Sequence, residues 1–218
     1  TGIVERISNN NVFINLGKTE ALLLPKEQVP TESYNHGDRI KVYIAEVKEA
    51  TQGPKIILSR THPGLLLRLM ELEVPEIHDG VVQVKSVARE AGNRSKIAVH
   101  SVDPNVDPVG SCVGGKGTRI KAVVDELHGE RIDVIPWDKD PALFVANSLS
   151  PAKVTKVEIQ EGEEKIARVI VPDDQLSLAI GREGQNARLA AKLTGWKIDI
   201  KSESQISAEV TEDGEKDS

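Results

Sequence analysis

The chain has 218 residues, 39% of them apolar, and a formal net charge of −6 at neutral pH. This length allows one large domain or two to four small ones, and no run of 18 apolar residues could span a bilayer. A single cysteine, Cys112, excludes an internal disulfide, fits a reducing cytosol and is expected to be a small buried side chain. The chain begins at Thr1 in a pattern typical of a strand, without a secretory signal, so we expect a fragment or a processed form.

The negative charge is concentrated at the carboxyl end of the chain. Residues 203–218 contain six acidic residues and one lysine, a net of −5, which leaves −1 for residues 1–202. This composition predicts an acidic, disordered tail. A nucleic-acid partner is not excluded, because a local basic face is sufficient for binding.

Residues 1–60 predict an all-β barrel domain. Five short strands are expected, separated by turn residues, at 3–4, 12–14, 21–24, 40–47 and 56–58. Five strands in about 60 residues suit an OB-fold, a common platform for single-stranded nucleic acid. Residues 61–75 predict a connector, with a leucine-rich helix over 64–73 packed between domains and stopped at Val74-Pro75.

Residues 76–139 and 140–202 predict two small α+β domains. In the first, strands are expected at 80–87 and 95–102. In the second, a helix over 140–149 precedes strands at 154–159 and 166–171 and a short helix over 173–180. The junction between them is so short that we expect the pair to pack rigidly and offer a continuous binding surface.

A glycine-centred segment occurs once in each of these domains, as CVGGKGTRIKAVVDELHGERIDV and as AIGREGQNARLAAKLTGWKIDI. The glycine pairs Gly114/Gly117 and Gly181/Gly184 lie 67 residues apart. In both copies a Gly-x-x-Gly turn is followed by an amphipathic helix, another glycine and a short apolar strand. A repeat that spans several kinds of element indicates two copies of one structural unit.

This unit favours binding of a phosphate backbone. Two glycines permit positive φ angles and let another chain approach, and the following helix directs free N–H groups and its positive dipole end toward the turn. KH modules use a Gly-x-x-Gly loop to clamp about four nucleotides of single-stranded nucleic acid. A lone copy would be read as an ordinary helix start, but two copies in matching context favour the clamp.

The candidate RNA contacts lie in or next to these turns. They are Gly114, Gly115, Lys116, Gly117, Arg119 and Lys121 in the first copy, and Gly181, Arg182, Glu183, Gly184, Gln185, Asn186, Arg188 and Lys192 in the second. Gln185 and Asn186 are alternatively helix caps. Ile198 is expected to line an aliphatic groove for the bases, since only 3% of the residues are aromatic and extensive stacking is not expected.

Longer segments resemble one family in order and spacing. They are LSRTHP (58–63), EVPEI…DG (73–80), VDPVGSCVG (106–114), ELHGERIDV (126–134) and LSLAIGREGQNARLAAKLTGWKIDI (176–200). Over about residues 1–202 the chain resembles the NusA family of bacterial transcription elongation, termination and antitermination factors. The resemblance implies a multidomain fold, an S1-type OB-fold barrel followed by two α+β KH domains of the prokaryotic type (type II). It further implies binding of single-stranded nascent RNA, with effects on polymerase pausing, termination and antitermination.

Two departures from the family pattern limit what the resemblance implies. The polymerase-binding N-terminal domain is outside the match, so RNA polymerase and antitermination factors are partners implied mainly through parts absent from this chain. Typical S1-type domains carry two aromatic residues and a histidine on the RNA face. Here Phe13 matches one aromatic, while Asn10 and Leu24 stand at the other positions, so we expect a weaker RNA-binding barrel. Arg60 is the best remaining contact, with a solvated arginine as the alternative.

An enzyme is the strongest rival interpretation. Gly110–Thr118 resembles the phosphate loop of adenylate-kinase-type NTPases, which follows a buried strand. Here Asp107-Pro108-Val109 precedes it, and the second copy has Glu183 where Lys116 stands in the first. We therefore expect no enzymatic activity.

Other classes of function have less support. The histidines are scattered and no nucleophile motif is present, so we expect no metal and no cofactor. A protein-interaction role for the tail or the connector could coexist with RNA binding. The overall expectation is a monomeric, cytoplasmic RNA-binding regulator without a membrane partner.

Overall fold

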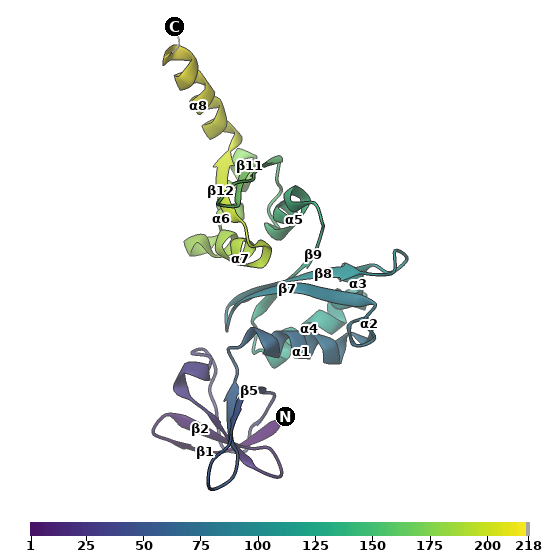
Figure 1. The fold of residues 1–218 in the computed structure, drawn as a ribbon, viewed down its shortest axis with the longest axis vertical. Coiled ribbons are helices and arrows are strands. Elements are labelled where there is room, and N and C mark those ends of the chain that lie inside the picture. Colours follow the sequence, from purple (N-terminus) through teal and green to yellow (C-terminus); the bar gives the residue numbers. More distant parts are fainter. Residues whose placement is uncertain (217–218) are drawn as a thin grey trace. The chain divides into compact units, whose positions relative to one another are not determined.

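The computed structural model (Figure 1) describes residues 1–216. The chain divides into two compact units. The first unit consists of Thr1–Asp79, Arg89–Ser95 and Cys112–Ile132, and the second of Gly80–Ala88, Lys96–Ser111 and Asp133–Ser218. None of the helices within residues 1–216 is long and apolar enough to cross a membrane.

A curled six-stranded sheet opens the first unit. Its strands are β1 (Gly2–Ser8), β2 (Asn11–Asn15), β3 (Glu20–Leu23), β4 (Arg39–Ile40), β5 (Tyr43–Lys48) and β6 (Lys55–Ser59), in the order β4-β1-β2-β3-β6-β5. The strand predicted at 40–47 is thus two strands. β4 pairs with β1, and β5 pairs with β6, so both edges of the sheet come from one stretch of chain. The interruption between β4 and β5 lets the sheet curl toward a barrel.

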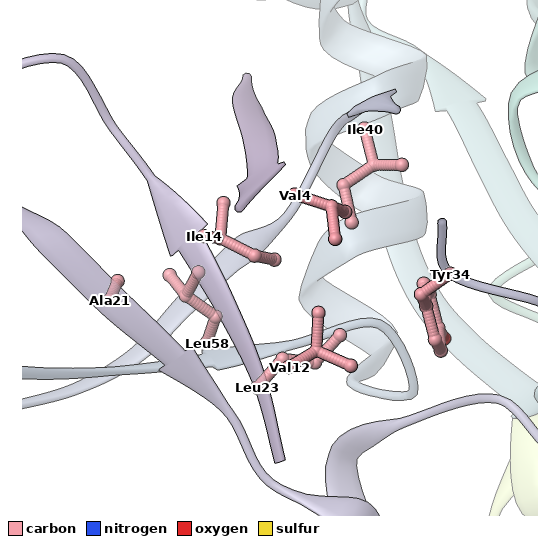
Figure 2. Packing of buried hydrophobic residues seen from close by; sticks show 8 residues of the cluster. All are labelled: Val4, Val12, Ile14, Ala21, Leu23, Tyr34, Ile40 and Leu58. Carbon is pink, nitrogen blue, oxygen red and sulfur yellow. The ribbon is translucent and has the colours of Figure 1, made fainter. Parts of the chain in front are cut away.

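The barrel core follows from alternation along the strands. Val4, Ile14 and Ala21 face one another across β1, β2 and β3, because Ile14 pairs with Val4 on one side and with Ala21 on the other. The buried cluster is Val4, Val12, Ile14, Ala21, Leu23, Tyr34, Ile40 and Leu58 (Figure 2). Burial of a Val, Leu or Ile side chain stabilises the fold by about 1.5–3 kcal/mol.

Helices α1 (Pro63–Glu73), α2 (Pro75–His78) and α4 (Thr118–Glu126) also belong to the first unit. α1 is the helix predicted over 64–73. It begins with a proline in its first turn, and Nδ1 of His62 accepts a hydrogen bond from the Gly64 N–H at 2.9 Å. α1 packs beside α4 (Figure 1), and its Leu65, Leu66 and Leu69 are buried, so this segment is a packed layer of the unit that carries the first Gly-x-x-Gly loop.

Strands β7 (Val82–Glu90), β8 (Arg94–Ser101) and β9 (Arg131–Pro136) form a three-stranded sheet in the order β7-β8-β9. The central strand is buried from Arg94 to Val99. It includes Lys96, whose Nζ donates to Asp133 at 2.9 Å and to the Ser150 carbonyl at 2.8 Å within the second unit. A buried ammonium requires such partners, because an unpaired charge in the interior is costly.

The second Gly-x-x-Gly loop lies in an α+β layer of the second unit. Its elements are α5 (Pro141–Ser148), β10 (Lys156–Gln160), β11 (Ile166–Val171), α6 (Leu176–Ile180), α7 (Gln185–Thr194) and β12 (Lys197–Ser202). β11 lies between antiparallel β10 and parallel β12. Every second residue of β11 (Ala167, Val169 and Val171) is buried in one cluster with residues such as Leu149, Ala179 and Ala190.

The acidic segment after β12 corrects one prediction. Residues 203–216, expected to be disordered, form helix α8 (Glu203–Lys216) (Figure 1). Glu209 accepts hydrogen bonds from Lys201 and Arg168, which hold the pKa of its carboxyl below the usual value. The composition of the segment shows its acidic residues, but it does not show that Arg168 of β11 and Lys201 of β12 lie next to one of them. Residues 217–218 of the predicted tail lie outside the described residues.

Candidate nucleic-acid interface

The two Gly-x-x-Gly loops have matching backbones although their middle residues differ. The opening glycines Gly114 and Gly181 have φ/ψ of 78°/169° and 80°/168°. Lys116 and Glu183 follow with φ of 57° and 56°, and the closing glycines have φ of 72° and 74°. The sequence repeat is therefore a structural repeat, and two successive residues with positive φ shape each loop.

The opening and closing glycines are required for different reasons. A Cβ on Gly114 would lie 2.7 Å from Cγ of Arg119, and a Cβ on Gly181 would lie 2.7 Å from the backbone N of Asn186. A Cβ on Gly117 or Gly184 would meet no atom closer than 3.9 Å. On the Cβ side of each opening glycine the protein's own helix fills the space, whereas the Cβ side of each closing glycine is open.

In the described part of the chain, each following helix begins without a side-chain cap. The closing glycine of each loop donates its N–H to the carbonyl of the opening glycine, at 3.0 Å in the first loop and 3.1 Å in the second. Within residues 1–216, no side-chain hydrogen bond caps α4 or α7, and neither first turn contains an acidic residue. The uncapped N–H groups and the positive end of the helix dipole thus lie beside each loop.

Five of the six basic side chains predicted near the loops are exposed: Lys116, Lys121, Arg182, Arg188 and Lys192. Arg188 also donates to the Glu183 carbonyl at 3.0 Å, which places it over the second loop. Arg119 is half-buried, and both predicted cations of α4 pair with carboxylates. Arg119 pairs with Glu76 at 2.8 Å, and Lys121 pairs with Asp125 one turn along α4.

Two polar residues predicted from the second copy were expected either to contact RNA or to cap the helix. Asn186 is fully buried, and its Nδ2 donates to the carbonyls of Leu149 at 3.0 Å and Ala179 at 2.9 Å. The prediction that Asn186 contacts RNA is therefore wrong, since the side chain fastens the start of α7 to the ends of α5 and α6. Gln185 and the predicted groove residue Ile198 are half-buried, and Ile198 packs against the core beside β11.

The structure also corrects the prediction for Arg60. Its side chain is 0% exposed and makes a bidentate pair with Glu32, with the shortest N–O distance 2.8 Å. It also donates to the carbonyls of Lys41 at 2.8 Å and Glu126 at 3.1 Å. Arg60 is neither an RNA contact nor a solvated arginine. It is a structural link between the barrel and α4, because the planar guanidinium can satisfy several acceptors at once.

Phe13 is the predicted barrel contact that remains accessible. Its ring is half-buried and lines a cavity of about 280 Å³ together with Leu22, Gly53 and Lys55. The guanidinium of Arg6 lies 3.8 Å from the ring centroid. Sequence reasoning missed Arg6. Pairing the hairpin of β1 and β2 would have found it, because Arg6 is opposite Phe13 in the register.

The structure does not favour the enzyme alternative. The first loop follows helix α3 (Pro108–Val113), whereas a phosphate-transfer loop of the kind considered follows a strand. Within the described residues, no group of three His, Cys, Asp or Glu side chains could hold a metal ion. Cys112 is fully buried, as expected.

Family models match most of the chain in three consecutive segments. They are described as "S1 RNA binding domain" for residues 1–60, "NusA-like first KH domain" for residues 60–137 and "NusA-like second KH domain" for residues 141–208. The second of these segments includes α1. The predicted fold class, an S1-type barrel followed by two KH domains, is thus confirmed.

Curated relatives agree with these models. The protein named "Transcription termination/antitermination protein NusA" is 65% identical in Halalkalibacterium halodurans over 94% of this chain and 53% of the relative. In Bacillus subtilis it is 66% identical over 93% of this chain and 54% of the relative, and in Thermus thermophilus 53% identical over 95% and 53%. A solved structure described as "Crystal structure of APE1850" is 26% identical over 62% of this chain and 96% of its own, with a TM-score of 0.47, and adds nothing to the assignment.

The chain spans about half the length of the curated relatives that it matches. The identities over nearly all of this chain, the order of the three family models and the matching loop geometry lead to one assignment. The chain belongs to the NusA family, of which it carries an S1 domain followed by two NusA-like KH domains.

Proposed function

We propose that this S1–KH–KH segment binds single-stranded nascent RNA and acts through that RNA on polymerase pausing, termination and antitermination. The observation that carries the proposal is the pair of Gly-x-x-Gly loops with the same backbone, each beside an uncapped helix start. Relatives named for termination and antitermination support the transcriptional role. The role is non-catalytic, and the segment acts as a cytoplasmic monomer. RNA polymerase and antitermination factors are partners of the longer protein.

Each loop holds one short stretch of RNA backbone. The N–H groups at the loop and helix start bind phosphate oxygens, and Lys116 in the first loop and Arg182 in the second add positive charge. Arg188 and Lys192 extend the cationic surface along α7, since residues four apart lie on the same helix face. The bases lie on aliphatic side chains such as Ile180 and Ile198.

The middle residues of the loops give the sharpest test, because they can change without disturbing the glycines. Lys116→Asp and Arg182→Asp each change the charge by two units, and aspartate tolerates the positive φ of Lys116. Lys153→Asp is the matched control, with the same charge change at an exposed lysine outside both loops. Affinity for a labelled single-stranded RNA is measured by fluorescence anisotropy at several salt concentrations.

Each loop variant should weaken binding, and the combined variant should weaken it further, while Lys153→Asp should have little effect. The slope of log affinity against log salt should become shallower by about 0.7 for each phosphate that a variant no longer neutralises. If the combined variant binds with the affinity and salt slope of the Lys153→Asp control, the loops are not the RNA clamps.

A further inference from the structure

Both tryptophans of the chain line one cavity that no motif had indicated. The cavity has a volume of about 320 Å³, and its lining includes Trp137, Trp196, Phe144, Lys85, Lys139 and Thr194. All of these residues belong to the second unit. Neither Gly-x-x-Gly loop contributes to it. The chain has only two tryptophans, and both lie at this cavity together with Phe144.

The Trp137 indole packs against two other rings. The backbone N–H of Trp137 donates to the Val99 carbonyl at 2.8 Å, and the ring meets His100 and Phe144 edge to face, with centroids 5.2 and 6.4 Å apart. Trp196 lies in the turn between α7 and β12, where its backbone N–H donates to Oγ1 of Thr194 at 3.3 Å. Such an aromatic platform needs little ordering when a planar ligand binds.

The charges around the platform fit an anionic ligand. Nζ of Lys85 lies 4.7 Å from the ring centroid of Trp137, and Nζ of Lys165 lies 5.8 Å from that of Trp196. Lys85 and Lys139 are exposed. Among the described residues that line the cavity, Asp138 has the one carboxylate, and it accepts the backbone N–H of Asp140 at 2.8 Å. A planar ring that carries a nearby negative charge, as a nucleotide does, matches this combination.

The cavity also lies at a useful distance from the second RNA loop. α7 begins at that loop with Gln185 and ends at Thr194, on the cavity wall, and ten residues of helix span about 15 Å. The exposed side chains of Arg188 and Lys192 lie one turn apart on α7, between its two ends. A single-stranded RNA bound at the loop can therefore continue along α7 to the cavity.

We propose that this cavity is a base-stacking subsite for single-stranded RNA. One nucleobase stacks on the indole platform, and Lys85 and Lys139 bind the flanking phosphates. The proposal rests on the proposed RNA-binding function and adds a base-contacting site to it, at the opposite end of α7 from the loop.

Tryptophan emission reports directly on this cavity, because both tryptophans line it. Titration of the full chain with a single-stranded RNA oligonucleotide should quench that emission. The RNA concentration at half-maximal quenching should agree with the dissociation constant obtained from the anisotropy of labelled RNA. Trp137→Phe and Trp196→Phe each leave one reporter and identify which indole is stacked. Crosslinking of RNA containing 4-thiouridine should yield peptides from the cavity lining.

The variant Lys85→Gln/Lys139→Gln leaves the indoles and the loops intact. Its salt slope should be shallower by about 1.4, because two phosphates are no longer neutralised, and its affinity should fall, whereas the control Lys153→Gln should match the unaltered chain. Loss of stacking itself should lower affinity by about 5- to 150-fold.

The outcomes separate this subsite from the proposed function. RNA that binds with unchanged tryptophan emission, no cavity crosslink and an unaltered salt slope in the double variant overturns the subsite and leaves the loop clamps standing. A peptide that quenches the emission where RNA does not would also overturn it. Absence of RNA binding by anisotropy would overturn the proposed function and the subsite together.

Discussion

Alanine at the two glycines of the second loop should have unequal effects on stability. Gly184 has φ of 74° and ψ of 13°, a left-handed conformation with open space around the missing Cβ. Gly181 has φ of 80° and ψ of 168°, a region that only glycine normally occupies. Its Cβ would also lie 2.7 Å from the backbone N and 2.8 Å from the Cβ of Asn186. Gly181→Ala should therefore be the more damaging change.

The magnitudes follow from these environments. Gly184→Ala should cost about 1–2 kcal/mol, the penalty of a left-handed conformation for an L-residue. Gly181→Ala has two costs. The first is a backbone penalty of about 1–3 kcal/mol, and the second comes from displacing the start of α7. That displacement strains the two hydrogen bonds of buried Asn186, each worth about 0.5–1.5 kcal/mol. The total for Gly181→Ala is about 2–6 kcal/mol.

Urea unfolding followed by tryptophan fluorescence measures this difference, because both tryptophans and both glycines belong to the second unit. With a urea slope of about 2 kcal/mol per molar, the midpoint should fall by about 0.5–1 M for Gly184→Ala and by about 1–3 M for Gly181→Ala. Gly162→Ala is the control in the same unit, since a Cβ there would have its nearest neighbouring atom 4.0 Å away and the φ of Gly162 is not positive. Equal losses for Gly181→Ala and Gly184→Ala, or a larger loss for Gly184→Ala, would refute the steric argument.

Two further predictions concern polar residues that the structure shows to be buried, and two concern the acidic segment. Arg60→Met leaves the buried carboxylate of Glu32 unpaired and should lower stability by about 3–5 kcal/mol in a thermal melt, with RNA affinity per folded molecule unchanged; a selective loss of affinity would restore Arg60 as a contact. Asn186→Ala should cost about 1–3 kcal/mol by leaving buried carbonyls without a donor, and a loss of RNA affinity at full stability would contradict its structural role. Because the pKa of the Glu209 carboxyl is lowered in the folded chain, its contribution to α8 is complete above about pH 4.5 and is lost as the pH falls through the lowered pKa. Helicity measured by circular dichroism should therefore fall in acid, less steeply in Glu209→Gln, and an equally steep fall in that variant would refute the anchor. Deleting residues 203–218 removes a net charge of −5 and should leave RNA affinity equal or slightly higher, so a marked loss would assign the segment a direct role.

Local patterns in the sequence were sufficient for the repeat and for the barrel strands other than β4 and β5. Alternating apolar residues predicted the barrel strands, and the spacing of glycines with an amphipathic helix predicted two equivalent loops, whose φ angles agree within a few degrees. These features depend on steric rules that act over a few residues, so they can be read without knowing which segments meet. The resemblance of long segments to the NusA family was confirmed by the family models and relatives.

Only the tertiary structure decided which side chains remain available for RNA. Arg60 and Asn186 were chosen as contacts because they are polar and close to the expected surfaces, yet Glu32 lies 28 residues and the Leu149 carbonyl 37 residues away from them in the chain. The helix over 203–216 likewise depends on bases supplied by β11 and β12, and the tryptophan cavity brings together residues that share no motif. Burial and pairing of polar groups are set by contacts between distant segments, and local sequence carries no record of those contacts.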